Sequence, residues 1–582
     1  MQHTNSLHRV VRFGVFEADL RSGELRKDGT RVRLQEQPFQ ILLALLERPG
    51  EIVTREELRL KLWAADTYVD FDHGLNNAIK RLREALSDSA ENPRYIETLS
   101  RRGYRFMQSH DISLSSAPPQ DSIAVLPFTN LSMDPENEFF VDGITEEIIN
   151  ALAQIEHLHV AARSSAFFFK GKYVDLQAIG ERLKVRTILE GSVRRVGNHL
   201  RITAQLVNVA DGYHLWSERY EREMKDVFDI QDDIARSIVD RLKGIFAGNP
   251  QEPLVKAGTK NLEAYQLYLK GRAILFRKGP SIPRALECFE RAVGLAPDYA
   301  QAWAGVADSY TNLGYYGFAH PEATMPKGME SARRSVALDP SLAEAHGALA
   351  MACLMGAWDK AEAERGFLRA LELNPKYLQA RGWYALFYLQ FAEGRLQEGV
   401  AQAKLALESD PLSSYAHTIH SFTCAFAGKH AEAVHVSRRA VELDAESYLA
   451  HAILAAVLYL SERFEEAVAA AELALAISGR HSWAMVVLAE SLAGCGKRAE
   501  AEATYSELIC RARRYYVQPS SLAMAAAAVG IQDEAIRYAR EAFQIRDPFS
   551  LVWFSKIWPP SAQLRMDPRF AELGVDMGWL LK

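Results

Sequence analysis

The sequence has few cysteines, and their placement excludes the sites that cysteines most often build. Only five occur in 582 residues, and none stands in a CxxC pair or among clustered histidines. Neither a disulfide framework nor a zinc site is expected, and no metal or other cofactor is predicted. Ala-rich, helix-like surroundings indicate reduced thiols in a packed core for all five: Cys288, Cys353, Cys424, Cys495 and Cys510.

Long apolar runs are missing as well. The longest cover residues 449–460 and 522–531, and both are shorter than the roughly 20 residues that cross a bilayer. The N-terminus also lacks the basic-then-apolar pattern of a secretory signal. Together with reduced thiols, these absences predict a cytoplasmic protein that has no membrane partner.

An excess of positive charge is the third absence, since the formal net charge is −6. Bulk charge therefore does not make the chain a binder of polyanions, and any contact with nucleic acid requires a local basic patch. The length predicts several domains, or a repeat array with smaller domains beside it. Polar stretches rich in Pro, Gly and Ser divide the chain. The predicted organisation is a first domain over 1–108, a linker over 109–121, an α/β domain over 122–245, a linker over 246–261, a helical repeat array over 262–547 and a capping segment over 548–582.

Internal repetition is the clearest pattern in the second half. Segments that start near residues 291, 334, 369, 405 and 439 align with one another, and the aligned position holds Pro four times and then Ala445. The later steps are roughly 34–36 residues, and the region resembles tetratricopeptide repeat arrays. The resemblance implies an all-α superhelix that receives a protein or peptide partner. The aligned prolines are Pro297, Pro340, Pro375 and Pro411.

The middle region alternates strand and helix signals. Glu146 and Glu147 fit the start of a helix, where carboxylates suit the helix dipole, better than a catalytic pair. The run 167–173 lacks the spacing of a phosphate-binding loop. The region resembles the TolB N-terminal-like domain, which is not known as an enzyme family, and no enzyme activity is predicted. The expected elements are strands at 123–128 and 158–169, helices at 141–155 and 175–185, two or three strands within 186–221, and a helix at 226–242.

The N-terminal region has the order strands, three helices, hairpin. Strands are expected at 13–20, 23–29 and 30–34, and helices at 38–50, 54–63 and 72–86. Thr54 and Glu57 fit a capping box. The final hairpin pairs 96–99 with 104–107, and Gly103 stands where a tight turn needs positive φ.

The third helix is amphipathic. Leu75, Ile79, Leu82 and Leu86 share the face that must pack inward. Arginine can pair with guanine, asparagine with adenine, and lysine with phosphate, so the opposite face suits reading of the major groove. That face holds His73, Asn77, Lys80, Arg81 and Glu84, with Asn76 and Arg83 beside it.

"AIKRLREAL" (78–86) followed by "IETLSRRGYRF" (96–106) resembles the OmpR/PhoB-type winged helix, in a CadC-like arrangement. The resemblance implies an α+β winged helix whose third helix enters the major groove of double-stranded DNA. The wing tip would reach phosphates or the minor groove, and the loop 63–72 matches the family segment that can meet RNA polymerase. The residues expected at DNA are Asn77, Lys80, Arg81, Arg83, Thr98, Arg101, Arg102 and Tyr104.

The chain is predicted to be a one-component transcription regulator. No room precedes the winged helix for a receiver domain, and residues 109–121 hold no membrane span, so control is expected from the C-terminal regions. The α/β domain would couple the two ends or assemble copies of the chain into a homo-oligomer. Two alternatives stay open: an interaction scaffold whose winged helix no longer binds DNA, and, ranked last, an enzyme such as a cyclase or hydrolase.

Overall fold

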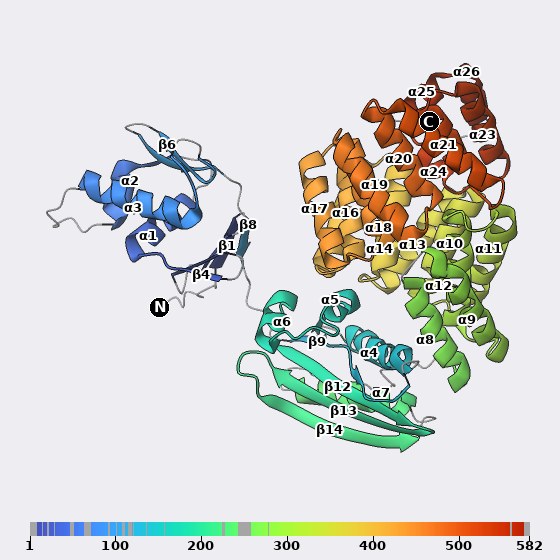
Figure 1. Cartoon of the computed structure of the whole chain (residues 1–582). Helices are drawn as coiled ribbons and strands as arrows, with labels where there is room; N and C mark the ends of the chain where they lie inside the picture. Colours follow the sequence, from blue (N-terminus) through green and yellow to red (C-terminus); the bar gives the residue numbers. More distant parts are fainter. Residues whose placement is uncertain are drawn as a thin grey trace. The chain divides into compact units, whose positions relative to one another are not determined.

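The chain forms two compact units, residues 1–120 and residues 121–582, in a computed structural model (Figure 1). The structure describes residues 9–575 except 14–15, 20–22, 28–29, 47–49, 51, 63–70, 91–92, 100–101, 108–110, 115–118, 120, 135–136, 156–157, 224–226, 243–257, 277–278 and 559–560.

The first unit contains two antiparallel sheets. The five-stranded sheet has the order β4-β3-β2-β1-β8, and the three-stranded sheet has the order β5-β7-β6. Phe13, Phe16, Tyr95 and Phe106 pack their rings together in the core. The strands are β1 (Arg9–Phe13), β2 (Phe16–Asp19), β3 (Glu24–Lys27), β4 (Thr30–Val32), β5 (Ile52–Thr54), β6 (Ile96–Leu99), β7 (Gly103–Phe106) and β8 (Asp111–Leu114).

Three helices lie between these strands in the sequence: α1 (Glu36–Leu46), α2 (Arg55–Leu62) and α3 (Phe71–Leu86). The capping box before α2 is confirmed. The Thr54 amide donates to Glu57 Oε2 at 2.7 Å, and the Glu57 amide donates to Thr54 Oγ1 at 3.2 Å. The reciprocal bonds satisfy two amides at the start of the helix, which explains why α2 begins there.

Three strands of this unit were not predicted. Strand β1 shares only Phe13 with the strand expected at 13–20, where β2 lies. Strand β8 lies inside the expected linker 109–121 and pairs with β1, because its backbone finds a partner about 100 residues away. Strand β5 pairs with β7, so the wing is three-stranded. Gly103 has the positive φ that the sequence predicted, but its place in the hairpin differs. It lies within β7 at φ +155°, and a Cβ there would come 2.1 Å from the Val53 carbonyl oxygen. Close approach of β5 therefore requires the glycine.

The second unit begins with a six-stranded sheet, ordered β11-β9-β12-β13-β14 with β10 beside β12. Ile123 and Val125 pack toward α4 and α7, whereas Ala124 and Ile188 join a second cluster with α6. The expected strand 158–169 is wrong in its second half, which forms α5. The elements are β9 (Ser122–Val125), β10 (Thr129–Asn130), α4 (Asn137–Ala153), β11 (His159–Val160), α5 (Arg163–Phe167), α6 (Leu176–Leu183), β12 (Thr187–Val196), β13 (His199–Asn208), β14 (His214–Glu223) and α7 (Val227–Leu242).

This α/β domain packs directly on the repeats, with which it shares one hydrophobic core. The expected linker 246–261 lies mostly outside the described residues. Glu146 of α4 pairs with Arg272 of α8 (Leu262–Phe276) and, at 3.0 Å, with Arg163. Burial would raise the pKa of Glu146, but the two arginines outweigh it and hold that pKa below its usual range. The prediction that Glu146 stands in a first helical turn is wrong, because α4 begins at Asn137.

The repeats are eight consecutive antiparallel helix pairs, α8/α9 through α22/α23. The four aligned prolines lie in the turns between one pair and the next. First helices of successive pairs pack on one another and build the inner layer. The helices are α8 (Leu262–Phe276), α9 (Ile282–Leu295), α10 (Ala300–Tyr315), α11 (Pro321–Leu338), α12 (Ala343–Ala352), α13 (Lys360–Leu373), α14 (Leu378–Trp383), α15 (Leu396–Ser409), α16 (Ser414–Phe426), α17 (His430–Leu443), α18 (Tyr448–Leu460), α19 (Phe464–Ser478), α20 (Ser482–Gly494), α21 (Arg498–Ala512), α22 (Pro519–Ala528) and α23 (Gln532–Gln544).

The sequence predicted that residues 548–582 cap the open end of the stack. In the structure, the chain after α23 does more than this. The segment with α24 (Ser550–Trp553), α25 (Ser561–Met566) and α26 (Pro568–Val575) returns to the inner layer. The Phe549 ring lies 4.8 Å from Tyr315 of α10, and Trp558 stacks 6.4 Å from Tyr459 of α18. The side chains of Phe549, Trp553 and Trp558 are fully buried. They fill space that the stack alone would leave open.

Within the described residues, no helix is both long enough and apolar enough to cross a membrane.

Candidate nucleic-acid interface

Helix α3 has one buried and one exposed face, as its periodicity predicted. Leu75, Ile79, Leu82 and Leu86 are at most 2% exposed and pack in the core of the first unit. Five polar side chains are exposed on the other side, and they include three of the residues expected at DNA. The exposed ones are Asn76, Asn77, Lys80, Arg81 and Glu84.

The exposed side chains of α3 differ in how far the protein already holds them. Among the described residues, no hydrogen bond or ion pair engages the side chain of Asn77 or Lys80. Arg81 donates to Gln35 Oε1, an exposed contact just before α1. An exposed contact of this kind exchanges readily with water, so Arg81 can also turn toward a ligand.

Arg83 is committed to the protein rather than free. It is half-buried, and its Nη2 donates to the Ile96 carbonyl oxygen at 2.7 Å and to Thr98 Oγ1 at 2.8 Å. These bonds tie α3 to the first wing strand. The structure thus places Arg83 and Thr98 together, in a contact that orients the wing against the helix.

Tyr104 is also internal, since its side chain is 3% exposed. Its hydroxyl accepts from Arg55 Nη1 at 2.9 Å and donates to Asn76 Oδ1 at 3.2 Å. Arg55 Nη2 donates to the same Asn76 oxygen at 3.2 Å. Because these three residues come from β7, α2 and α3, the network fixes the spacing of the wing and the two helices. The expected direct contact of Tyr104 with DNA does not fit its burial, and its place is behind the surface.

The turn between α3 and the wing is organised by Asp88, a residue that the sequence analysis did not single out. Its carboxylate accepts from the amides of Arg94 at 2.6 Å and Ile96 at 2.8 Å, and also from Tyr95. The Asp88 amide donates to the Arg83 carbonyl at 2.9 Å. An acidic residue soon after a helix and before a hairpin is the signal that could have indicated this role.

The wing tip presents Arg102. Its amide donates to the Leu99 carbonyl at 2.9 Å, which closes the turn, and its side chain is exposed with no described partner. Arg101 lies outside the described residues, as do residues 63–70 of the loop 63–72 that is expected to meet RNA polymerase. Across the wing, Arg105 Nε donates to Glu97 Oε2 at 2.8 Å, which stabilises the hairpin.

Free donors thus stand on two elements that a partly buried network of hydrogen bonds holds in place. Asn77 and Lys80 project from a helix of 16 residues, and Arg102 projects from a hairpin beside it. Amide and cationic groups at these places can bond base edges and phosphates at once. Glu84 is exposed on the same helix and disfavours phosphate, so contact is expected from the part of α3 that precedes Glu84.

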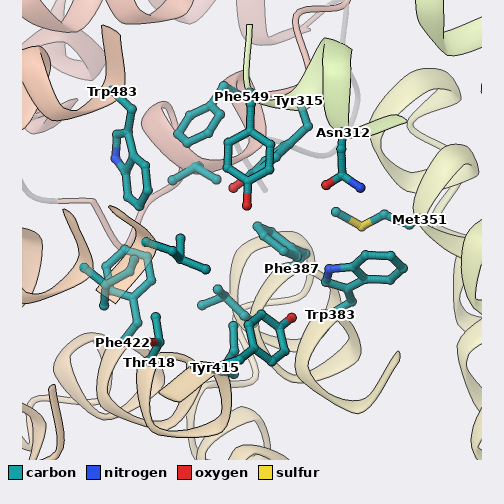
Figure 2. Close-up of a pocket in the computed structure, with 16 residues that line it drawn as sticks. Asn312, Tyr315, Met351, Trp383, Phe387, Tyr415, Thr418, Phe422, Trp483 and Phe549 are labelled. Atoms are coloured by element: carbon teal, nitrogen blue, oxygen red, sulfur yellow. The ribbon is translucent and has the colours of Figure 1, made fainter. Parts of the chain in front are cut away.

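The inner face of the repeats is a second candidate site. Figure 2 shows aromatic and polar side chains from several first helices pointing toward one another, with Phe549 among them. The space left between them is only about 40 Å³, enough for very few water molecules. A peptide does not fit there while residues 549–558 occupy the inner layer.

Comparison with known proteins assigns the first unit. Residues 29–106 match the family model "Transcriptional regulatory protein, C terminal". The chain carries an OmpR/PhoB-type transcriptional regulatory domain. Residues 119–237 match a second model, "HilA/YgeH-like transcriptional regulator, second domain". The α/β domain is therefore of a kind found in transcription regulators, and its TolB N-terminal-like resemblance stays a prediction.

Two curated relatives cover larger parts of the chain. A protein named putative adenylate cyclase 3 from Rhizobium meliloti is 38% identical over 238 residues, which are 40% of this chain and 40% of that protein. The transcriptional regulator HilA of Salmonella typhimurium is 24% identical over 395 residues, 67% of this chain and 68% of the relative. The chain thus spans about two fifths of the length of the first relative and about two thirds of the second.

Among solved structures, the DNA-binding domain of Klebsiella pneumoniae RstA, in complex with the RstA box, is similar. It is 32% identical, and the match covers 17% of this chain and 98% of that domain, with a TM-score of 0.16.

Proposed function

We propose that the chain is a DNA-binding transcription regulator that reads promoter DNA through α3 and the wing of its first unit. One observation carries the proposal: the side chains of Asn77, Lys80 and Arg102 are exposed and have no partner among the described residues, on two elements that hydrogen bonds hold together. A winged helix kept only as a scaffold has no need of free donors at these places. The regulator family models over both N-terminal domains support the same reading.

In this proposal the eight residues first expected at DNA divide into two groups. Asn77, Lys80, Arg81 and Arg102 contact DNA, and Arg101 is proposed to join them at the wing tip. Arg83, Thr98 and Tyr104 position the helix and the wing. The division follows from burial and from hydrogen bonds within the protein.

No catalytic role is proposed. A relative of this chain is named as a putative adenylate cyclase, but the acidic pair of the α/β domain is used structurally here. Glu146 is paired with Arg163 and Arg272. Burial raises the pKa of Glu147 to about 7. We propose three kinds of protein partner. They are proteins that contact the repeats, RNA polymerase at the loop 63–72, and other copies of the chain.

The proposal is tested by selection of DNA by the full chain. The protein is mixed with sheared genomic DNA and an excess of unspecific competitor, and the bound fragments are sequenced. We expect enrichment of a small set of fragments that share a motif, and mobility shifts on the best of them.

A matched pair of variants makes the result specific. Lys80→Ala with Arg81→Ala should abolish the enrichment, whereas Arg438→Ala with Arg439→Ala, on exposed residues of the repeats, should leave it intact. If no fragment is enriched by the unaltered chain, the scaffold alternative replaces the proposal.

A further inference from the structure

Strand β14 has ten residues and is an edge strand of the six-stranded sheet. It pairs with β13 on one side, and no described strand pairs with it on the other (Figure 1). The outward amides and carbonyls of an edge strand can pair with another chain, and proteins usually block such an edge with Pro, a bulge or charges. Strand β14 has no Pro, and its register shift against β13 lies near its start, beside Leu206 and Val207. Residues 216–222 thus form a regular edge that can accept another strand.

The charges along this edge follow a self-complementary order. Residues 218–222 read Glu-Arg-Tyr-Glu-Arg, and all four charged side chains are exposed. Read backwards, the segment has arginine where the forward reading has glutamate, and glutamate where it has arginine. A second copy that runs antiparallel about Tyr220 therefore places opposite charges directly across from one another, which stabilises a strand pair. The facing pairs, each formed twice by two-fold symmetry, are Glu218 with Arg222 and Arg219 with Glu221.

The neighbouring registers of this pairing are disfavoured. Directly opposed residues of two antiparallel strands point to the same face of the sheet, so the two-fold axis must pass a residue and not the space between two residues. Moving the axis from Tyr220 to the residue before it places Arg219 opposite itself, and moving it to the residue after places Glu221 opposite itself. Like charges directly opposite one another destabilise a strand pair. The charges that keep an ordinary edge strand from pairing therefore select one register here.

The contacts that these side chains make within the chain can be exchanged for contacts with a partner. Tyr220 is only 5% exposed and packs in the core that the sheet shares with α7, which holds the strand in place. Arg219 Nε donates to Glu221 Oε1 at 2.9 Å, and Arg201 Nε pairs with the same oxygen at 2.7 Å. Arg222 Nη1 donates to the Glu221 carbonyl at 3.0 Å. These contacts between charged groups are exposed and exchange readily with water, so they do not prevent pairing with a second strand.

We propose that two copies of the chain associate through β14, antiparallel about a two-fold axis at Tyr220, so that their sheets become continuous. The partner is a second copy of this chain, which specifies one of the partners proposed above. A strand pair of this length buries less surface than a permanent interface, so the dimer is reversible, with a dissociation constant in the micromolar range. Each dimer carries two copies of the first unit. On the proposed DNA-binding function, it therefore binds DNA with two sites more tightly than a monomer does.

Sedimentation velocity of the full chain tests the proposal, without DNA and with a reductant because Cys510 is exposed. Between about 1 and 100 μM, the unaltered chain should shift from monomer to dimer, and added salt should weaken the association. Arg219→Glu and Glu221→Arg should each weaken it about 10-fold or more, because each variant places like charges opposite one another. Arg194→Glu makes the same change of charge at an exposed residue of β12, away from the edge, and should leave the association intact.

A mixture of the two edge variants guards against a folding artefact. Each variant repels its own copies, but the Arg219→Glu chain and the Glu221→Arg chain carry complementary charges. When mixed, they should form a heterodimer with an affinity near that of the unaltered chain, and each should keep its circular dichroism. A chain that stays monomeric up to about 100 μM, a dimer that Arg219→Glu leaves intact, or a mixture without heterodimer would each overturn the proposal. Because no DNA is present, these outcomes are independent of the proposed DNA binding.

Discussion

At the residue scale, two arginines on one helix have different tasks. Arg81 is exposed and, in the part of the chain that the structure describes, bonds only Gln35, whereas Arg83 bonds the backbone and a side chain of the first wing strand. The sequence predicts both arginines on the polar side of α3. Only their hydrogen-bond partners in the structure show that their roles differ. The same holds for Tyr104, whose aromatic ring is buried and whose hydroxyl joins two helices.

Alanine substitutions at these two arginines should therefore have different effects on stability and on DNA binding. Arg81→Ala should change the free energy of unfolding of the 1–120 fragment by no more than about 0.5 kcal/mol. It should cost about 1–3 kcal/mol on a selected duplex and relax the preference at one or two base pairs. Arg83→Ala should lower the free energy of unfolding by about 1.5–3 kcal/mol, because charged hydrogen bonds are lost. Urea unfolding and duplex titration measure the two quantities. Equal loss of stability in both variants would show that the division of tasks is mistaken.

A second residue-scale prediction concerns Glu490, which is buried in the inner layer of the repeats. Burial raises the pKa of Glu490 to about 8, and the hydrogen bond from Trp558 Nε1, at 3.3 Å, opposes this rise. The unfolded chain releases that proton near pH 4.5, so the folded state binds more protons between about pH 4.5 and 8. The contribution of Glu490 to stability should fall as pH rises through this window, by up to roughly 1.4 kcal/mol per pH unit.

Glu490→Gln removes this dependence, because the amide keeps an acceptor and has no proton to lose. Melting of the full chain between pH 5 and 8 should show a flatter profile and a higher melting temperature near pH 8. Glu408→Gln, at an exposed carboxylate, is the matched control and should follow the unaltered chain. A variant profile as steep as that of the unaltered chain would mean that Glu490 is not protonated in the fold.

At the element scale, the wing depends on the close approach of its strands β5 and β7. Gly103 of β7 faces the Val53 carbonyl of β5, where a Cβ has no room. Gly50 is a useful contrast, because its φ of +76° is also positive but its surroundings are open. Gly103→Ala should lower the free energy of unfolding of the 1–120 fragment by about 3 kcal/mol or more, through strain and loss of the β5–β7 pairing.

Gly50→Ala should lower the free energy of unfolding of the same fragment by only about 1–2 kcal/mol, which is the penalty for a residue with a side chain in the left-handed conformation. Denaturant unfolding of both variants measures the difference. A Gly103→Ala variant as stable as Gly50→Ala would contradict the close approach of β5 to the wing.

Elements with a strong period of their own could be predicted from sequence, and elements that depend on distant partners could not. The periods of α3 and of the repeat helices fixed their faces, since core packing repeats every three to four residues. Strands β5 and β8 have only three and four residues and are defined by pairing with β7 and β1. The positioning network of Arg55, Asn76 and Tyr104 joins residues up to 49 positions apart, so no local sequence pattern could predict it.

At the scale of the whole molecule, the C-terminal segment returns to the repeats and fills their inner face. Trp558 is fully buried among Phe422, Phe426 and Tyr459 and donates to Glu490. Residues distant in sequence thus stabilise the stack together, beyond the contacts between neighbouring repeats. A partner that uses this inner face must first displace the segment.

Removal of this ring tests the packing. Trp558→Ala should destabilise the second unit by about 3–5 kcal/mol, the usual cost of emptying a buried aromatic site. Thermal melting of the full chain should show the loss, and Tyr515→Ala, at a side chain 64% exposed, should not. Equal melting temperatures for Trp558→Ala and the unaltered chain would place the segment outside the core.

The central claim is that uncommitted cations on α3 and on the wing contact DNA phosphates and bases together. The most direct test is the affinity of the full chain for a selected duplex at several salt concentrations, compared with the Lys80→Ala, Arg102→Ala double variant. We predict weaker binding and a plot of log K against log salt that is shallower by about one to two units, since each lost phosphate contact removes about 0.9. The same affinity and the same slope in both proteins would contradict the claim.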